Sequence, residues 1–219
     1  YYRGLNYLHI PTTMTAIVDS AIGGKTGINH KKFINAIGNY YHPKHVFIIH
    51  EIIKNLPERE FLAGIPEIIK CGLLKDKSIL DSLNKNKNKI LSRDFATIAN
   101  LCVKTLKCKI FFFRKDVREN HDRLFLNFGH TFGHSIEIST DKKNKDFFRH
   151  GEAVGLGILC EIFYSNGKNQ FFKCVTDLLI KYNLPTFISS KYFNNKLSQE
   201  IYKNLYKDKK RIFKNPRFI

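Results

Sequence analysis

The chain has 219 residues, of which 37 are Lys or Arg and 19 are Asp or Glu, so its formal net charge is +18. This length suits one large domain or two small ones, and the 43% of hydrophobic residues can form a substantial core. No apolar run is long enough to span a membrane and no basic segment is interleaved with aromatic residues, so we expect no membrane or nucleic-acid partner, and the positive field favours small anionic substrates.

The chain start and the cysteines indicate the context of the protein. The first residues contain neither an initiator Met nor a signal-peptide pattern, so we expect a fragment of a longer protein. No two cysteines form a CxxC pair, and most lie in apolar segments: Cys71, Cys102, Cys108, Cys160 and Cys174. This usage predicts reduced, buried thiols in a cytoplasmic protein.

Short strands are predicted in the first part of the chain. Residues 5–10 alternate loosely and end at Pro11, which is typical of a strand. Residues 14–20 predict a short helix or a turn. Residues 45–50 form a β-branched run that predicts a buried strand.

A glycine-rich turn lies between these strands, with Gly23 and Gly24 before Lys25. It is not a Walker A loop, because Asp19 stands where that motif requires glycine. The glycines permit a close approach of backbone to a ligand, and Lys25 offers a point charge to an anion. An ordinary turn that binds nothing would have the same pattern.

From Pro57 onward the pattern is typical of helices. Pro57 and Pro66 suit the first turns of two helices, and Asp94 can cap another that runs to about Phe112. The polar stretch at 75–92 is predicted to be a helix end and a loop. Later helices are expected at 127–139, 150–166, 170–182 and 196–207. The fold class predicted is an α/β part followed by a helical domain, with the site in the cleft between them.

The sequence leaves two interpretations for each of two lysines in the helical segments. Lys70 lies three residues after Glu67, so the two can share a substrate or form a surface ion pair. Lys109 ends the apolar stripe of its helix, and it either extends along the surface to solvent or points into a cavity.

Three histidines and Glu67 suggest a metal site. His130 and His134 are four residues apart, so a helix places both imidazoles on one face, and His150 follows in a separate segment. Two histidines and a carboxylate are the ligands of an open, catalytic zinc site. The spacing alone leaves open which two histidines bind, and a histidine pair on a helix is also common without a metal.

Seven motifs occur in one order over nearly the whole chain. They are Pro11–Thr13, Asp19–Asn29, Asn35–Gly38, Leu56–Phe61, Gly64–Lys70, Leu126–His134 and His150–Val154. Together they resemble the 3-dehydroquinate synthases. The resemblance implies that residues 1–55 are the C-terminal part of a Rossmann-like NAD domain and that residues 56–219 form a helical metal- and substrate-binding domain. The glycine-rich turn for the NAD pyrophosphate is expected before residue 1, so this piece alone should bind NAD poorly.

The resemblance also implies roles for individual residues. The metal ligands, for Zn²⁺ or alternatively Co²⁺, are Glu67, His130 and His150. The catalytic residues are His134 and Glu119, both acid/base groups, with Lys70 and Lys25. The substrate contacts are Asp19, Lys25, Asn35, Lys70, Lys109, Arg123, Asn127 and one of Lys209 and Lys210, together with Arg3 from the second subunit of a homodimer. The NAD contacts are Thr12, Thr13, Asp19, Ile52 and Asn55.

The reaction that the resemblance implies is a step of the shikimate pathway towards aromatic amino acids. 3-Deoxy-D-arabino-heptulosonate 7-phosphate becomes 3-dehydroquinate and phosphate through transient oxidation by NAD, phosphate elimination, re-reduction and aldol closure. Ile34 stands where the family usually has lysine, which leaves open a related cyclase that makes a valiolone or a deoxy-inosose from another sugar phosphate. Two more distant hypotheses stay open as well, a polyol dehydrogenase of similar architecture and a basic nucleic-acid-binding protein.

Overall fold

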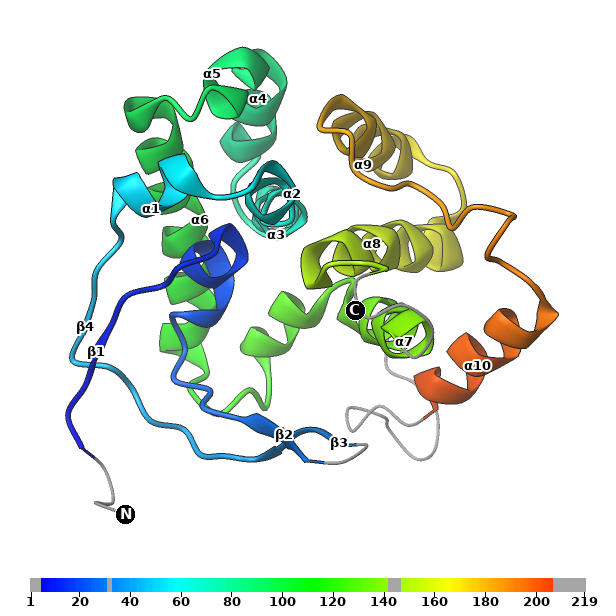
Figure 1. Ribbon diagram of the computed structural model, residues 1–219, viewed down its shortest axis with the longest axis horizontal. Coiled ribbons are helices and arrows are strands. Elements are labelled where there is room, and N and C mark those ends of the chain that lie inside the picture. The colour runs from blue at the N-terminus through cyan, green and yellow to red at the C-terminus, as the bar shows by residue number, and fades with distance from the viewer. Residues whose placement is uncertain (1–4, 31–32, 142–146, 207–219) are drawn as a thin grey trace.

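The computed structural model describes residues 5–30, 33–141 and 147–206, and in this part a few short strands are followed by a helical body (Figure 1). The strands pair in twos, β1 parallel with β4 and β2 antiparallel with β3. Their bounds are β1 Leu8–His9, β2 Ile28–His30, β3 Phe33–Ile37 and β4 His45–Val46. The observed architecture is thus a small α/β part that leads into helices, as predicted.

The helices account for most of the chain after residue 50. In the first half they are α1 His50–Asn55, α2 Glu58–Leu62, α3 Ile65–Leu74, α4 Ser78–Lys85, α5 Lys87–Leu91 and α6 Phe95–Lys115. In the second half they are α7 His130–Asp141, α8 His150–Asn166, α9 Gln170–Lys181 and α10 Asn195–Leu205. Two irregular turns, the π-helical η1 at Ala16–Ser20 and the 3-10 helix η2 at Asp122–Asn127, precede β2 and α7. No described helix is both long and apolar enough to cross a bilayer.

The prediction of a buried strand over residues 45–50 is wrong. Only His45 and Val46 pair with a neighbouring strand, and α1 already begins at His50. Phe47 and Ile48 are 48% and 39% exposed. Within the described residues β4 pairs with β1 alone, and the apolar side chains that suggested a core strand are only partly covered.

Helix α3 lies in the centre of the helical body, and its residues from Ile65 to Gly72 are all buried. It packs against α4, α6 and α8. A helix surrounded in this way is usually apolar on every side. Here it also carries two charged residues, Glu67 and Lys70, and both are buried with it. This places a carboxylate and an ammonium group in the interior, where only a specific partner can compensate for their desolvation.

The prediction of a loop at 75–92 is also wrong, because this stretch folds into α4 and α5. Ile79, Leu83 and Ile90 are completely buried, and their spacing places them on the inner side of the two helices. The Lys and Asn residues between them cover the outer side. Tyr182, which directly follows α9, donates its hydroxyl to the carbonyl of Leu83 at 2.8 Å and ties α9 to α4.

The other helix boundaries follow the signals in the sequence. The carboxylate of Asp94 accepts a hydrogen bond from the Thr97 amide at 2.9 Å and caps α6 as predicted. Pro66 lies in the first turn of α3, and Pro57 immediately precedes α2. The three helices predicted from residue 150 onward are confirmed to within two residues, and the one predicted at 127–139 begins at His130.

Glycines let α8 approach its neighbours closely. A Cβ atom on Gly151 would lie 1.7 Å from the carbonyl oxygen of Ala63, just before α3. One on Gly157 would lie 1.9 Å from the carbonyl oxygen of Gly129, which directly precedes α7. These contacts place α8 against the starts of both α3 and α7. The metal-ligand candidates of these three helices therefore meet.

Candidate metal centre and active site

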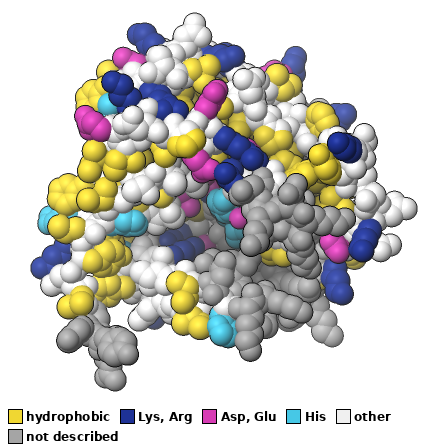
Figure 2. Space-filling model, viewed as in Figure 1, with side chains coloured by type: hydrophobic (Ala, Val, Ile, Leu, Met, Phe, Trp, Pro, Cys, Tyr) yellow, Lys and Arg dark blue, Asp and Glu magenta, His cyan; other side chains and the backbone are white. Residues whose placement is uncertain are grey.

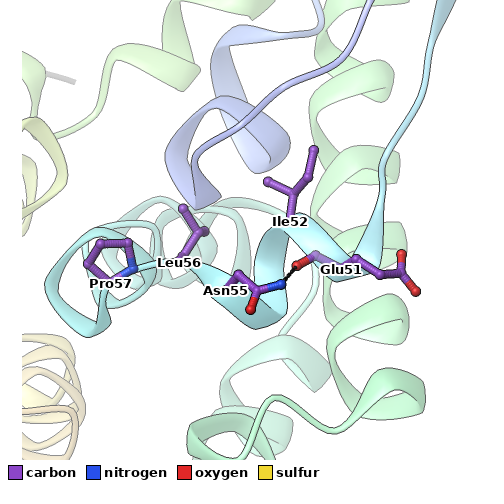
Figure 3. A pocket seen from close by; sticks show the side chains of 5 residues that line it. All are labelled: Glu51, Ile52, Asn55, Leu56 and Pro57. Carbon is purple, nitrogen blue, oxygen red and sulfur yellow. Dashed lines mark hydrogen bonds between the residues drawn. The ribbon is translucent and has the colours of Figure 1, made fainter.

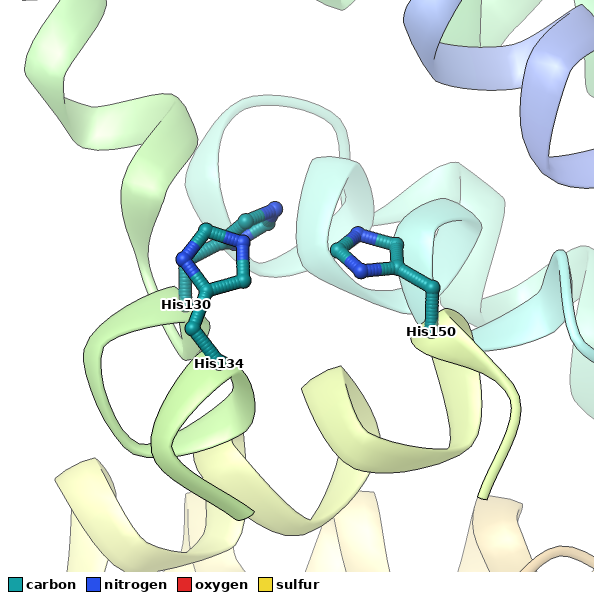
Figure 4. Close-up of side chains that lie close together, drawn as sticks. All are labelled: His130, His134 and His150. Atoms are coloured by element: carbon teal, nitrogen blue, oxygen red, sulfur yellow. The ribbon is translucent and has the colours of Figure 1, made fainter. Parts of the chain in front are cut away.

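The three histidines come together at the starts of two helices. His130 begins α7, His134 follows one turn later, and His150 begins α8. One ring nitrogen from each lies within 4.8 Å of the others, a separation at which a single metal ion can contact all three (Figure 4). The ring centroids are 5.3 to 5.6 Å apart.

Glu67 of α3 faces the same space. Its side chain is only 1% exposed, and its Oε1 atom lies 3.4 Å from His130 Nε2 and 3.9 Å from His150 Nε2. Among the described residues this oxygen has no hydrogen-bond partner. A buried carboxylate oxygen opposite two imidazole nitrogens is a donor set that suits a divalent cation such as Zn²⁺. The residues present therefore fit the metal that the sequence predicts.

The second nitrogen of two of these rings is held by the protein. His130 Nδ1 lies 3.2 Å from the carbonyl oxygen of Phe128, and His150 Nδ1 lies 3.0 Å from Glu137 Oε2. Burial by itself would lower the pKa of His150, but the neighbouring carboxylates of Glu137 and Glu67 outweigh it and raise that pKa. Both rings thus direct Nε2 towards Glu67. Glu137 was not among the predicted site residues, although its position three residues after His134 on one helix face was a usable signal.

Ion pairs fix the start of α8, which carries His150. Arg59 of α2 binds the carboxylate of Glu152 with two hydrogen bonds of 2.8 and 2.7 Å. The same carboxylate caps the helix by accepting from the amide of Arg149 at 2.9 Å. Arg149 in turn donates to Glu60 of α2 at 2.5 Å. The bidentate pair of Arg59 and Glu152 fixes the first turn of α8 relative to α2. The position of His150 therefore depends on α2 as well as on Glu137 of α7.

A network of buried charges adjoins the metal-ligand candidates. Lys70 forms an ion pair with Glu67 Oε2, and Lys109 Nζ lies 2.6 Å from Asp19 Oδ1 and also contacts the carbonyl oxygen of Asp19. Lys109 therefore points inward, which decides between the two predicted orientations. Burial raises the pKa of Asp19, but Lys109 and Lys70 together have the greater effect and hold it well below its usual range. Two ion pairs, Lys70 with Glu67 and Lys109 with Asp19, therefore lie next to the candidate metal ligands.

The glycine turn is held by Arg123. Gly23 and Gly24 both have positive φ angles, 117° and 66°, which side chains rarely adopt. The buried guanidinium of Arg123 donates to the Gly23 carbonyl at 2.9 Å and to the Val117 carbonyl at 2.7 Å. Arg123 thus stabilises the turn in this structure, and its predicted contact with substrate stays a prediction.

Glu119 connects this turn to η2. It is one of three described residues other than glycine with a positive φ angle, 61°. Its carboxylate forms an ion pair with Lys25 and accepts a hydrogen bond from Asn127 Nδ2 at 2.5 Å. Burial lowers the pKa of Lys25, and Glu119 partly offsets this. Glu119 thus has an unfavourable backbone conformation and contacts both Lys25 and Asn127, two of the predicted substrate contacts. Such strain is typical of functional residues.

Four of the five predicted cofactor contacts lie in the segments that directly follow β1 and β4. Thr12 and Thr13 follow β1, and Ile52 and Asn55 lie in α1, which follows β4. Because the two strands are parallel, both segments leave the carboxyl end of the sheet, where open α/β sheets bind ligands. Ile52 and Asn55 line a pocket of about 410 Å³ whose other residues are Glu51, Leu56 and Pro57 (Figure 3).

The remaining predicted residues are only partly described. Arg3, Lys209 and Lys210 lie outside the described residues, and of Asn35 only the backbone, in β3, is described. Histidine, basic and acidic side chains gather near the middle of the molecular face seen in Figure 2. Contacts within the described part link most of the other predicted residues in three groups: Glu67 with Lys70, His130 and His150, Asp19 with Lys109, and Glu119 with Lys25 and Asn127.

Comparison with known sequences identifies the family. The model for the 3-dehydroquinate synthase N-terminal region matches residues 1–63, and that for the C-terminal region matches residues 64–211. The 3-dehydroquinate synthase of Dictyoglomus thermophilum is 46% identical over 158 residues, which are 72% of this chain and 44% of that protein. That of Ruminiclostridium cellulolyticum is 37% identical over 227 residues, which cover 100% of this chain and 61% of that protein. The chain spans about half the length of the curated relatives it matches.

Solved structures share the fold. A 2-epi-5-epi-valiolone synthase from Streptomyces hygroscopicus with NAD⁺ and Zn²⁺ bound has a TM-score of 0.78 at 22% identity, and the match covers 91% of this chain and 56% of that one. A 2-deoxy-scyllo-inosose synthase complexed with carbaglucose-6-phosphate, NAD⁺ and Co²⁺ has a TM-score of 0.77 at 25% identity, with coverage of 96% and 56%. The sequence matches, over nearly the whole chain and on the motifs that form the site, show that the chain belongs to the 3-dehydroquinate synthase family.

Proposed function

We propose that this chain is the metal- and substrate-binding portion of a 3-dehydroquinate synthase, which converts 3-deoxy-D-arabino-heptulosonate 7-phosphate into 3-dehydroquinate and phosphate. The observation that carries the proposal is the convergence of Glu67, His130 and His150 on one space, with Lys70 beside them. The identities of 36 to 46% to curated 3-dehydroquinate synthases favour this substrate over those of the structural relatives.

Glu67, His130 and His150 would hold the metal, with His134 as an acid/base group beside it. A set of three histidines is also within reach of one ion. Three considerations favour Glu67: it is buried, its Oε1 faces both Nε2 atoms, and a carboxylate leaves the site a lower net charge than three neutral imidazoles do. Zinc with a carboxylate and two imidazoles keeps a free position for a substrate oxygen.

Residues 1–55 would supply one side of the NAD site, and residues 56–219 the metal and substrate groups. Thr12, Thr13, Ile52 and Asn55 are the NAD contacts, at the carboxyl end of the parallel strand pair. Asp19 lies between the two sets, bound to Lys109. Such a division agrees with a Rossmann-like part that presents its cofactor to a helical domain.

The positions of these residues suggest a role for each in the proposed conversion. When bound, NAD takes up and returns a hydride, and the divalent metal stabilises negative charge on substrate oxygens. Lys25, Lys70 and Lys109 orient the substrate through its phosphate and carboxylate, since hydrogen bonds between ammonium groups and anions are charge-assisted. His134 moves a proton at the reacting hydroxyl, and Glu119 and Asn127 hold Lys25 in place for the anion.

A substrate comparison tests the proposed function. The protein that contains this chain, supplied with NAD and Zn²⁺, should release phosphate from 3-deoxy-D-arabino-heptulosonate 7-phosphate and not from other sugar phosphates. The absorbance of NADH should show no net rise, because the cofactor is regenerated in each turnover. Release of phosphate from glucose 6-phosphate in its place would identify a related cyclase, and stoichiometric NADH formation would identify a polyol dehydrogenase.

Metal content tests the ligand assignment separately. Glu67→Ala, His130→Ala and His150→Ala should each abolish retention of Zn²⁺ after dialysis, whereas His134→Ala should keep the metal and slow turnover. Zinc content is measured by atomic absorption, with unfolding curves to confirm that each variant is folded. Retention of the metal by Glu67→Ala together with its loss from His134→Ala would show that the three histidines are the ligands.

A further inference from the structure

The carboxylate of Glu137 is the least expected member of the site. It lies on α7 seven residues after His130 and three after His134, so it shares their helix face. Its Oε2 atom is 3.0 Å from Nδ1 of His150, which belongs to the next helix. The side chains of Glu137 and His150 are 34% and 33% exposed, so both are partly shielded from solvent.

This contact determines which nitrogen of His150 is available. A carboxylate beside Nδ1 requires the proton there, and the Nε2 lone pair then points the other way. On that other side lies Glu67 Oε1, 3.9 Å from His150 Nε2. Without such a partner a neutral imidazole divides between two tautomers and rotates about its side-chain bonds, and only one of these arrangements presents Nε2 to a metal.

His130 provides an internal comparison. Its Nδ1 is held at 3.2 Å by the carbonyl oxygen of Phe128, in the turn that leads into the same helix. A backbone carbonyl accepts a hydrogen bond in the same way as a carboxylate, so both rings obtain the same tautomer by different means. At His150 the group beside Nδ1 is a side chain, and that side chain can be replaced.

We infer that Glu137 is a positioning residue of this metal site: it does not bind the ion but holds the His150 imidazole with its proton on Nδ1 and with Nε2 directed at the space shared with Glu67 and His130. The inference rests on the proposed metal site and deepens it. The outer partner of a ligating histidine typically changes metal affinity by about 10- to 100-fold when it is removed. Glu137 therefore controls affinity without contributing a ligand.

Two substitutions separate this role from simple packing. Glu137→Ala removes the acceptor, and Glu137→Gln keeps an acceptor oxygen in the same shape without the charge. Glu200→Ala is the matched control, because it removes a partly exposed carboxylate from α10, outside the histidine cluster. Zinc affinity is measured for all three and for the unchanged protein by competition with a chromophoric chelator. Thermal unfolding of the metal-free proteins is followed in parallel.

We expect Glu137→Ala to bind Zn²⁺ about 10- to 100-fold more weakly, Glu137→Gln to recover most of the affinity, and Glu200→Ala to bind as the unchanged protein does. Nitrogen NMR of the metal-free protein, recorded at a pH above the raised pKa of His150 so that its ring is neutral, should show the Nδ1–H tautomer of His150 in the unchanged protein and a mixture in Glu137→Ala. His150→Gln serves to assign the signals. This tautomer ratio would not respond to a merely structural role.

The experiment distinguishes a failure of the inference about Glu137 from a failure of the proposed metal site. Equal zinc affinity and an unchanged His150 tautomer in Glu137→Ala would overturn the inference and leave the proposed metal site intact. A loss of affinity that Glu137→Gln does not recover, with an unaltered tautomer and a lowered unfolding temperature, would also overturn it, because Glu137 would then only hold α7 against α8. Absence of zinc binding by the unchanged protein would instead refute the metal site itself.

Discussion

Replacing Gly151 by alanine should separate two helices that the site needs in contact. The new Cβ atom would lie 1.7 Å from the carbonyl oxygen of Ala63, whereas ordinary contacts begin at 3.4 Å. The obstacle is backbone and cannot rotate away, so the start of α8 must move from the start of α3 by roughly the 1.7 Å that is missing. His150 and Glu67 lie on the two segments that move apart.

The magnitude follows from two opposing effects. Alanine gains about 1 kcal/mol over glycine inside a helix. Overpacking against atoms that cannot yield costs about 1–3 kcal/mol or more, and the size of this clash places Gly151→Ala at the upper end. We expect a net loss of about 2 kcal/mol, which for a chain of this length lowers Tm by about 4–8 °C.

Gly155→Ala is the matched comparison, one helical turn further along α8. Its Cβ would meet Leu179 Cδ2 at 3.2 Å and Pro66 Cγ at 3.3 Å, contacts that side chains can relieve by a few tenths of an ångström. We expect its Tm to change by no more than about 2 °C, since the helix gain offsets mild crowding.

Differential scanning calorimetry and chelator competition for Zn²⁺ would measure both variants. Gly151→Ala should lose stability and roughly tenfold or more in zinc affinity, because a site tolerates only small displacements of its ligands, while Gly155→Ala should keep both. If the two variants unfold at the same temperature and bind zinc equally, the close approach of α8 to Ala63 does not position the site, and the packing argument is refuted.

Three further predictions concern stability and are checked by denaturant unfolding. Asp94→Ala, which removes the cap of α6, should lower the denaturant midpoint of unfolding, and Asp94→Asn should lower it much less. Tyr182→Phe should cost about 1 kcal/mol, because the buried carbonyl of Leu83 loses its donor. The ionised form of Asp19 is favoured in the folded chain, so its contribution to stability is present above its unfolded pKa of about 4 and is lost as the pH falls. Lys109→Met should diminish that loss between about pH 5 and pH 3; an unchanged acid dependence would contradict the pairing.

Local signals were sufficient for most of the helices. Asp94 ahead of an apolar stripe and Pro66 after a glycine mark helix starts through backbone chemistry that acts within a few residues, and the structure has both. The spacing of His130 and His134 likewise placed the two imidazoles together, because a helix repeats about every 3.6 residues. The resemblance to a family added what spacing could not, namely the proposal that Glu67 and His150 are ligands and that His134 lies beside them.

The errors came from segments whose environment decides their conformation. Residues 75–92 are polar enough to suggest a loop, yet Ile79, Leu83 and Ile90 find a core to cover. Residues 45–50 are apolar enough to suggest a core strand, yet Phe47 and Ile48 stay 48% and 39% exposed among the described residues. In both cases burial depends on what packs against the segment, and the segment itself does not contain that information.

The sequence by itself determined the kinds of chemistry available. It predicts a helix that presents two imidazoles, and another helix that carries a carboxylate and an ammonium group within one turn. Only the tertiary structure decided that Glu67 Oε1 faces both Nε2 atoms, that Arg123 is engaged by Gly23, and that Glu137 holds His150. Helix periodicity and capping act over a few residues and can therefore be predicted from the sequence. Side chains that are distant in the chain meet through helix packing, whose outcome depends on the volumes and backbone contacts of all the neighbours at once.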